Sequence, residues 1–331
     1  MTTRIEWGLT PTRWDAFVRR CPQATFFHSP GWYLAQAQAY GYQLDPALVR
    51  FSDGTEALLP LATRAAYKAL TRLAFAGVEN GYGGWVSETP LSSEQAEEGY
   101  RLVRARYPNL RITGNPYDAA AALPSGWRGE ADETQALSIL PSDEQQQLMA
   151  TSRAKRARKA VRQGFTLEAI ENPSEADVAR FYELYAAHSA NWRYTRWRKD
   201  EAYFRALFRH AGDRLVLFLA HHEGQLAGQR IVACDATRAL DLYLSTDARF
   251  EPIDIGSFMV VAPLSWLHAH GYTLFDFLPS GNLDGVRAFK ASYGASPLAF
   301  TRGQCNGLFG RSLEALWQLA NRRAPLAASP S

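Results

Sequence analysis

The sequence has 331 residues and a formal net charge of +3, and 47% of its residues are hydrophobic and 12% aromatic. This composition is typical of a folded globular protein and excludes a mainly disordered chain. A chain of this length accommodates two domains of about 150 residues, each large enough to bury a core. Because the net charge is small, any affinity for polyanions must come from a local cluster of cations.

The three cysteines, Cys21, Cys234 and Cys305, are widely spaced, with no Cys-x-x-Cys pair and no Cys/His cluster. That pattern is typical of a reducing compartment and argues against a metal site. The longest apolar run, Leu215 to Ala220, is too short to span a bilayer, and the amino terminus lacks an apolar core of signal-peptide length. We therefore expect a cytoplasmic protein with no metal and no transmembrane segment.

The first half of the chain predicts strands and helices in mixed order. Ser29-Pro30 begins a helix that Gly41 ends, and a Ser-Asp-Gly turn joins two strands as a hairpin. The predicted strands are Arg4–Trp7, Ala47–Phe51, Ala57–Ala62 and Leu110–Thr113, and further helices begin after Thr10 and near Ser93.

The segment from Gly77 to Val86, GVENGYGGWV, contains four glycines within ten residues. It is either a tight loop whose bare backbone approaches a ligand or only a turn. The flanking aromatic residues favour the first interpretation, and Tyr82 and Trp85 are its candidate substrate-binding residues.

A basic segment, TSRAKRARKAVRQG, opens the second half and predicts a helix that ends at Gly164. Its cations are Arg153, Lys155, Arg156, Arg158, Lys159 and Arg162. They form either a solvated charged face or an anion-binding face. Because few acids offset them, repulsion at i,i+4 favours a bound anion, and Arg153, Arg156 and Arg158 are the candidate ligands of a phosphate-bearing donor.

The remaining elements follow in the order β-α-α-β-β-β-α-β-α-β, after a domain boundary between Glu130 and Leu148. The strands are expected at Phe165–Ile170, Arg214–His221, Leu226–Asp235, Ala239–Ser245, Thr273–Leu278 and Pro297–Arg302. The helices are expected at Ser174–Ser189, Asp200–His210, Ser257–His270 and around Lys290.

The stretch from Tyr272 to Gly294, YTLFDFLPSGNLDGVRAFKASYG, combines a buried strand, a turn and a short helix. Asp276 lies in that strand among large apolar side chains, and a buried carboxylate needs a partner. Lys290 is the next cation that is not obviously at the surface. The alternative is a Lys side chain that extends along an amphipathic helix to solvent.

A strand that ends in Asp-Phe, followed by a turn and F-K-x-x-[FY]-G, resembles the last strand-helix unit of the Fem-type aminoacyltransferases. It is equally similar to the CelD/BcsL-like acetyltransferase group, which shares the GNAT fold. The segments Ala24 to Trp32 and Ser152 to Gly164 also resemble these families. The resemblance implies an α+β protein of two tandem GNAT-like domains, with a degenerate copy at 1–140, an acyltransferase domain at 141–310, and a C-terminal helix and disordered tail at 311–331.

The resemblance also implies site residues. It places Lys290 at the acyl-transfer site, a substrate-binding arginine at Arg193 or else Arg196, and Tyr243 at the end of the fourth strand, where GNAT active sites open. The alternative for the segment around Arg193 is an interdomain packing loop.

Two positions depart from the family patterns. GNAT enzymes carry R/Q-x-x-G-x-G/A before the helix that binds pyrophosphate, whereas this chain has Gly256 alone, so a pyrophosphate would rely on Gly256, Ser257 and the helix amino end. Where Fem-type enzymes have a Lys that holds a nucleotide-linked precursor, this chain has Ala35 and Gln36.

We therefore expect an N-acyltransferase that moves an acyl or aminoacyl group to an amine of a cell-envelope or polysaccharide precursor. The donor is acetyl-CoA, another acyl-CoA or aminoacyl-tRNA, the acceptor is a small molecule or nucleotide-linked substrate, and no DNA is expected as a partner. Lys290 would offset the charge on the carbonyl oxygen, Asp276 would orient Lys290 or receive a proton, and Tyr243 would serve the leaving group. The alternative is a catalytically inactive GNAT-fold protein that binds polyanions such as RNA.

Overall fold

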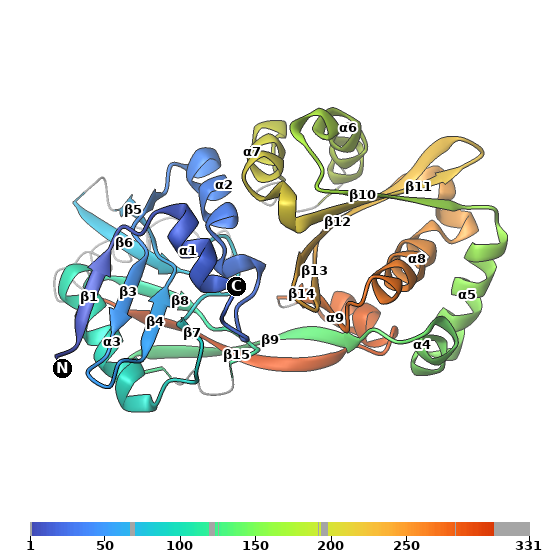
Figure 1. Cartoon of the computed structure of the whole chain (residues 1–331). Coiled ribbons are helices and arrows are strands. Elements are labelled where there is room, and N and C mark those ends of the chain that lie inside the picture. The colour runs from blue at the N-terminus through green and yellow to red at the C-terminus, as the bar shows by residue number, and fades with distance from the viewer. Residues whose placement is uncertain are drawn as a thin grey trace, which may run out of the picture. The chain divides into compact units, whose positions relative to one another are not determined.

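The structure is a computed structural model that describes residues 2–66, 70–118, 123–124, 126–190, 192, 198–281 and 283–307. The chain divides into two compact units (Figure 1). The first is Met1–Glu133 with the chain from Ala299 onward, and the second is Thr134–Leu298. Both contain helices and strands, so the expected mixed α/β class with two domains is confirmed.

The first unit contains two sheets, with strand orders β1-β3-β4-β7 and β15-β8-β6-β5-β2. Its strands are β1 (Arg4–Trp7), β2 (Gln43–Leu44), β3 (Ala47–Arg50), β4 (Glu56–Leu59), β5 (Ala62–Ala66), β6 (Thr71–Ala76), β7 (Val86–Ser87) and β8 (Leu110–Thr113). Its helices are α1 (Pro11–Val18), α2 (Pro30–Tyr40) and α3 (Ser93–Arg106). Two further strands, β9 (Arg128–Ser138) and β15 (Ser296–Cys305), have residues in both units.

The helix ends of the first unit follow from the local sequence. The Ser29 side chain caps α2 by accepting from the Trp32 amide, and Pro30 occupies the first helical position. Gly41 ends α2 with a φ of 71°, a conformation that costs glycine little. Aliphatic and aromatic side chains from β3, β4, β6, β8 and α3 then form the core of this unit.

The second unit is built around the sheet β10-β11-β12-β13-β14-β9. Its strands are β10 (Thr166–Glu171), β11 (Leu215–His222), β12 (Gln225–Asp235), β13 (Arg238–Thr246) and β14 (Leu274–Pro279), with the end of β9. Its helices are α4 (Ser142–Leu148), α5 (Thr151–Arg162), α6 (Val178–Ser189), α7 (Glu201–Ala211), α8 (Ile255–Ala269) and α9 (Asp284–Ala291).

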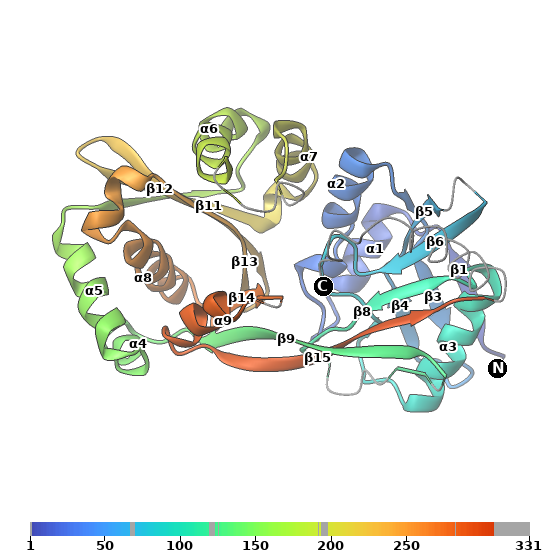
Figure 2. The ribbon, with the colours of Figure 1, turned by 180° about the vertical axis from the view of Figure 1, so that it is seen from behind.

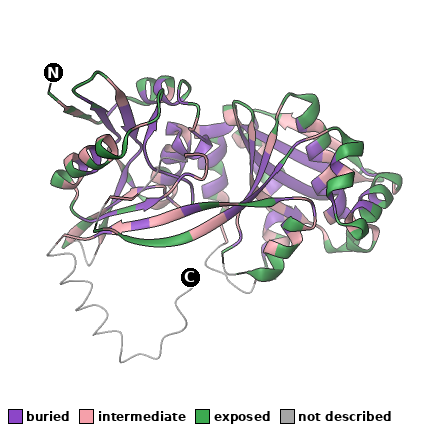
Figure 3. Cartoon of the chain, turned by 90° about the horizontal axis from the view of Figure 1, so that it is seen from below, coloured by how far each residue is buried: buried purple, intermediate pink, exposed green. Residues whose placement is uncertain are grey.

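Helices α6 and α8 pack on the sheet of the second unit from opposite sides, as both views show (Figures 1 and 2). The strands between them are mostly buried (Figure 3). Phe218, Phe275 and Leu264 belong to the core on the α8 side, to which α5 contributes Ala154 and Ala160. Apolar burial on this scale is the main source of stability for the unit.

The pairing of β13 with β14 positions the site described below. These two strands are parallel, and their register covers only Arg238–Leu240 opposite Leu274–Asp276. Within the described residues, β13 and β14 do not pair beyond Leu240 and Asp276.

Several elements differ from the sequence-based expectation. The two units divide between Glu133 and Thr134, inside the stretch from Glu130 to Leu148 that was expected to hold the boundary, but this stretch is occupied by most of β9 and by α4. Strands β5 and β6 form a hairpin that was not expected, and β15 extends to Cys305. The sequence of β9 is mostly polar and lacks the alternation of polar and apolar residues that predicts a strand. Its buried residues, Thr134 to Leu137, lie in the segment that pairs with β14, and this pairing is not visible in the sequence of β9.

None of the helices in the described ranges combines the length and the apolar character needed to cross a membrane.

Candidate functional site

Lys290 lies on α9 with its ammonium directed into the second unit. The residue is only 7% exposed, and Nζ donates a hydrogen bond of 2.6 Å to the carbonyl oxygen of Leu278. An ammonium has three donors, so this bond leaves two N–H groups of Lys290 for other partners. The interpretation of Lys290 as a side chain that extends to solvent is therefore wrong for this structure.

The carbonyl that receives this bond is presented by a bulge in β14. Asp276 pairs with Ala136 and Pro279 with Thr134, so Phe277 and Leu278 together oppose one residue of β9. Leu278 has a φ of 61°, a left-handed conformation that costs a branched side chain about 1–3 kcal/mol. The cost is offset because both polar backbone groups of Leu278 are bonded, the carbonyl to Lys290 and the amide to Asp276 Oδ1 at 2.7 Å.

Asp276 is completely buried in β14. Its Oδ1 accepts hydrogen bonds from the Thr134 hydroxyl and from the Leu278 amide. The sequence indicated that this carboxylate needs a partner, and the structure supplies a hydroxyl from β9 and a backbone amide in addition to the charge of Lys290.

Two further charged residues, Arg230 and Asp241, were missed by the sequence analysis. Arg230 Nη1 on β12 lies 3.1 Å from Asp241 Oδ2 on β13, and only 1% of the Arg230 side chain is exposed. Burial raises the pKa of Asp241, while Arg230 and Lys290 oppose that rise and Asp276 adds to it. The available signal was a cation inside the apolar strand sequence LAGQRIVAC, since a buried Arg requires a partner.

These residues form a cluster of two cations and two carboxylates, here called the Lys290 cluster: Arg230, Asp241, Asp276 and Lys290. Burial lowers the pKa of Lys290 to about 8, and the carboxylates of Asp241 and Asp276 act in the opposite direction. The ammonium form of Lys290 therefore dominates at neutral pH and keeps a buried cation beside the end of the β13–β14 pairing.

Tyr243 lies on β13, two residues after Asp241. Its hydroxyl donates to the hydroxyl of Tyr203 on α7 at 2.8 Å, and its ring packs against Phe204. A bulge separates the pairings of Asp241 and Tyr243 with β12, because Leu242 has no residue opposite it. The role of Tyr243 toward a leaving group stays a prediction.

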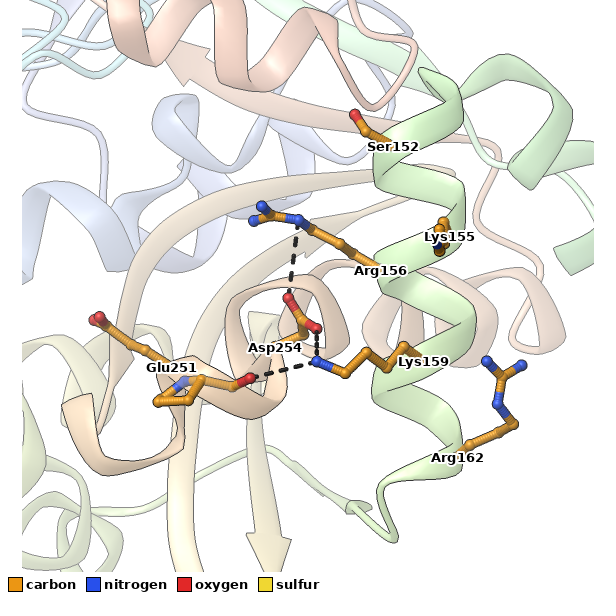
Figure 4. A pocket seen from close by; sticks show the side chains of 8 residues that line it. Ser152, Lys155, Arg156, Lys159, Arg162, Glu251 and Asp254 are labelled. Atoms are coloured by element: carbon orange, nitrogen blue, oxygen red, sulfur yellow. Dashed lines mark hydrogen bonds and ion pairs between the residues drawn. The ribbon is translucent and has the colours of Figure 1, made fainter.

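The basic helix α5 borders a cavity of about 570 Å³ (Figure 4). The cavity is lined by Ser152, Lys155, Arg156, Lys159, Arg162, Glu251, Pro252 and Asp254. Arg156 and Lys159 extend toward Asp254, with an Nζ–Oδ2 distance of 2.9 Å for Lys159 and an Nε–Oδ1 distance of 4.0 Å for Arg156. A carboxylate of the protein therefore already offsets part of the charge that predicted a bound anion.

The other two predicted donor ligands of α5 have different surroundings. The Arg153 guanidinium lies 4.9 Å from the ring centroid of Phe289 and donates to the Ser292 hydroxyl at 3.0 Å, which ties α5 to the α9 segment. Arg158 is exposed and donates to Gln146. Neither residue lines the cavity beside α5.

The amino end of α8, predicted to hold a pyrophosphate, begins at Asp254, which has a φ of 68°. The Ser257 amide donates to the Asp254 carbonyl, and the buried Ser257 hydroxyl accepts from Tyr293. A Cβ at Gly256 would meet nothing within 4 Å, so its backbone is accessible. Binding of an anion here stays a prediction, in competition with the carboxylate of Asp254.

In the first unit, Tyr82 and Trp85 are both buried, in contact with Phe27 and Tyr100 respectively. The glycines around them allow close packing within the chain: a Cβ at Gly83 would lie 2.3 Å from the Ala76 carbonyl carbon. These contacts account for the glycines of the loop without a ligand, and substrate binding by Tyr82 and Trp85 stays a prediction.

Arg193 and Arg196 lie outside the described residues. Within the described ranges, no group of three or more His, Cys, Asp or Glu side chains could hold a metal ion.

Comparisons with known proteins found one family model that matches part of this chain and several solved structures of similar fold. Residues 150–291 match the family model described as an acetyltransferase (GNAT) domain. Among solved structures, the chain is similar to FemX, with 14% identity and a TM-score of 0.72 over 96% of this chain and 99% of that one. It is also similar to L-PGS from Bacillus licheniformis, with 12% identity and a TM-score of 0.58 over 95% and 97% of the two chains. A comparison with curated proteins gave no match.

Proposed function

We propose that this protein is an N-acyltransferase, because residues 150–291 match the model of an acetyltransferase (GNAT) domain and the two-unit chain is similar in fold to FemX. The protein moves an acyl or aminoacyl group from a CoA thioester or an aminoacyl-tRNA to an amine of a cell-envelope or polysaccharide precursor. The observation that carries the proposal is the buried ammonium of Lys290 at the point where β13 and β14 stop pairing.

The reaction needs little covalent chemistry from the protein. The nitrogen lone pair of the acceptor attacks the carbonyl carbon, a C–N bond forms, the C–S or C–O bond to the donor breaks, and the amine loses one proton. The barrier lies in bringing donor and amine together and in the negative charge that develops on the carbonyl oxygen. The two N–H groups of Lys290 that remain after its bond to Leu278 supply donors and charge for that oxygen.

Asp276 and Tyr243 complete the proposed catalytic set. Asp276 Oδ1 accepts from both Thr134 and the Leu278 amide, an arrangement that supports the role of orienting the Lys290 helix rather than receiving a proton. To protonate the leaving group, the Tyr243 hydroxyl would turn its proton from Tyr203 to the leaving group, and the Tyr203 hydroxyl, 2.8 Å away, would then donate to the Tyr243 oxygen.

The cations of α5 support a phosphate-bearing donor. Lys155 and Arg162 line the cavity beside α5 and form no ion pair within the described residues. Both proposed donors carry phosphates, in CoA and in the acceptor stem of tRNA, and would neutralise these cations.

Replacement of Lys290 tests the proposal. We expect Lys290→Met to lower kcat by roughly 100-fold or more, because a preorganised donor to the developing oxyanion is lost. The assay uses acetyl-CoA and charged tRNA in parallel, with amino-sugar and peptide amines as acceptors. Arg287→Met is the matched control, since Arg287 lies on the same helix and pairs with the exposed Asp284. Equal turnover by Lys290→Met and the wild type, with a donor that the wild type uses, would remove Lys290 from the mechanism.

A second candidate function is polyanion binding without catalysis, which the exposed cations of α5 favour. If about three phosphates are contacted, the affinity for single-stranded RNA falls roughly 20-fold between 50 and 200 mM salt. Fluorescence anisotropy with poly(U) measures this, and Lys155→Gln with Arg162→Gln should flatten the salt dependence while Lys290→Met leaves it unchanged. Salt-independent binding would contradict this candidate.

A further inference from the structure

The first unit contains a cavity of about 400 Å³ whose lining residues all belong to that unit. A volume of this size is typical of sites for small ligands. The floor of the cavity is one face of the sheet formed by β6, β8 and β15. The register places Phe75 beside Arg111 and Arg111 beside Gln304, and residues that pair across strands direct their side chains to the same face.

Three arginines line this cavity. Arg111 and Arg302 are diagonal neighbours on the antiparallel pair β8–β15, a spacing that long side chains can bridge, and Arg128 comes from β9. Arg302 is neutralised by Asp132, at an Nε–Oδ2 distance of 2.7 Å. Arg111 and Arg128 are exposed and form no ion pair within the residues that the structure describes. Because a guanidinium binds a carboxylate or a phosphate through parallel hydrogen bonds, these two arginines supply donors for an anionic group.

The loop after β6 forms one wall of the cavity. Glu79 and Asn80 have φ values of 50° and 67°, a left-handed conformation that costs free energy. The loop is held in place because the Gly83 amide donates to the Thr113 carbonyl at 2.7 Å. The Glu79 carboxylate accepts from the Tyr42 hydroxyl at 3.1 Å. The glycine-rich segment therefore borders a cavity through Glu79 and Asn80.

The charges of the lining limit the kind of ligand. Three arginines and two glutamates, Glu79 and Glu130, give a formal net charge of +1 (3 − 2). That charge matches a ligand with one anionic group and disfavours a polyphosphate. The glutamates, Asn80 and Gln304 supply acceptors and donors for hydroxyl or amine groups, and the Phe75 ring supplies an apolar surface.

We propose that this cavity is a ligand-binding site of the first unit, in which Arg111 and Arg128 bind the single carboxylate or phosphate of a small molecule that also carries hydroxyl or amine groups. The site shares no residue with the Lys290 cluster or with the cavity beside α5. The proposal does not rest on acyl transfer.

Calorimetry of the full chain with three probes that have the same sugar ring tests this site. The probes are glucuronate, glucose 6-phosphate and uncharged glucose. At least one of the two anions should bind with a Kd below about 1 mM, and glucose should bind at least about tenfold more weakly, because it offers no partner for the arginines. The anion that binds more tightly identifies the anionic group of the ligand.

Replacements in the lining should change these affinities in different directions. Arg111→Gln and Arg128→Gln should each weaken binding of the anion by about tenfold or more, since a charge-assisted hydrogen bond is lost. Arg101→Gln is the matched control, because Arg101 is an exposed arginine on α3 that lies 3.9 Å from Glu98 and does not line the cavity. Glu130→Gln leaves three arginines against one glutamate. It should favour glucose 6-phosphate over glucuronate, because the phosphate carries the larger negative charge.

Three results would overturn the proposal: no binding of either anion up to about 10 mM, equal affinity for glucose, or an affinity that neither Arg111→Gln nor Arg128→Gln changes. Binding of CoA that Arg111→Gln weakens would also overturn it, because the site would then accept a polyphosphate. Lys290→Met should leave binding of the probes unchanged, so this test is separate from the test of acyl transfer.

Discussion

The buried charge of Lys290 bears on both the proposed function and the stability of the fold. Its pKa falls to about 8 from a usual value of 10.5 because burial disfavours the ammonium, and Asp241 and Asp276 only partly offset that effect. Holding a cation in this environment costs free energy of folding. A residue that performs no function at this position would be replaced by an apolar side chain at little cost.

The cost of this cation predicts a pH dependence of stability. Between about pH 8 and 10.5 the unfolded chain keeps a proton on Lys290 that the folded protein has released, so the free energy of unfolding should rise with pH across this range. The rise due to Lys290 is at most about 3 kcal/mol, or 1.36 kcal/mol for each unit of pKa. Denaturant unfolding of the wild type and of Lys290→Met, compared at each pH, isolates this contribution. A difference that stays constant from pH 8 to 10.5 would contradict it.

At the scale of elements, α5 is not a uniformly solvated helix. Its alanines at 154, 157 and 160 are buried, and its cations are divided between three surroundings. Arg153 joins the α9 segment, Arg156 and Lys159 face Asp254, and Lys155 and Arg162 line the cavity beside α5 without an ion-pair partner among the described residues. One charged sequence segment thus combines a structural contact with a candidate anion site.

This division predicts unequal effects of two arginine replacements on α5. Arg153→Ala removes a cation–π contact with Phe289 and a hydrogen bond to Ser292, and should lower the free energy of unfolding by about 1–2 kcal/mol. Arg158→Ala removes an exposed contact with Gln146 and should change it by less than about 0.5 kcal/mol. Urea titration followed by circular dichroism measures both. Equal effects would show that Arg153 does not secure the contact between α5 and the α9 segment.

On the scale of the whole molecule, the site draws on more than the segment that matches the GNAT domain. The match covers residues 150–291, whereas the Asp276 carboxylate is bonded by Thr134 from β9. The compact second unit begins at Thr134, and β9 continues back into the first unit. The strand that supports the Lys290 cluster therefore lies outside the family match, so a fragment that begins at residue 150 would lack Thr134.

Local sequence was sufficient to predict the elements that are specified by residues close together in the chain, such as helix caps and turns. The cap at Ser29, the helix end at Gly164 and the strand-turn-helix unit that carries Lys290 follow from spacing and from residues with special backbone preferences. The mixed α/β class and the order of elements in the second unit follow from the same patterns. The resemblance to Fem-type and CelD-like proteins then pointed to Lys290, although its catalytic role stays a proposal.

Only the tertiary structure decided which groups surround Lys290. Arg230, Asp241 and Thr134 come from three strands whose neighbours are set by sheet register, and the Leu278 carbonyl is turned toward Lys290 by a bulge of one residue. Periodicity assigns a residue to a face of its own strand but does not specify the residue opposite it, and a one-residue shift changes every neighbour. The sequence by itself determined the elements and the candidate lysine, while the pairing between strands determined its charge and partners.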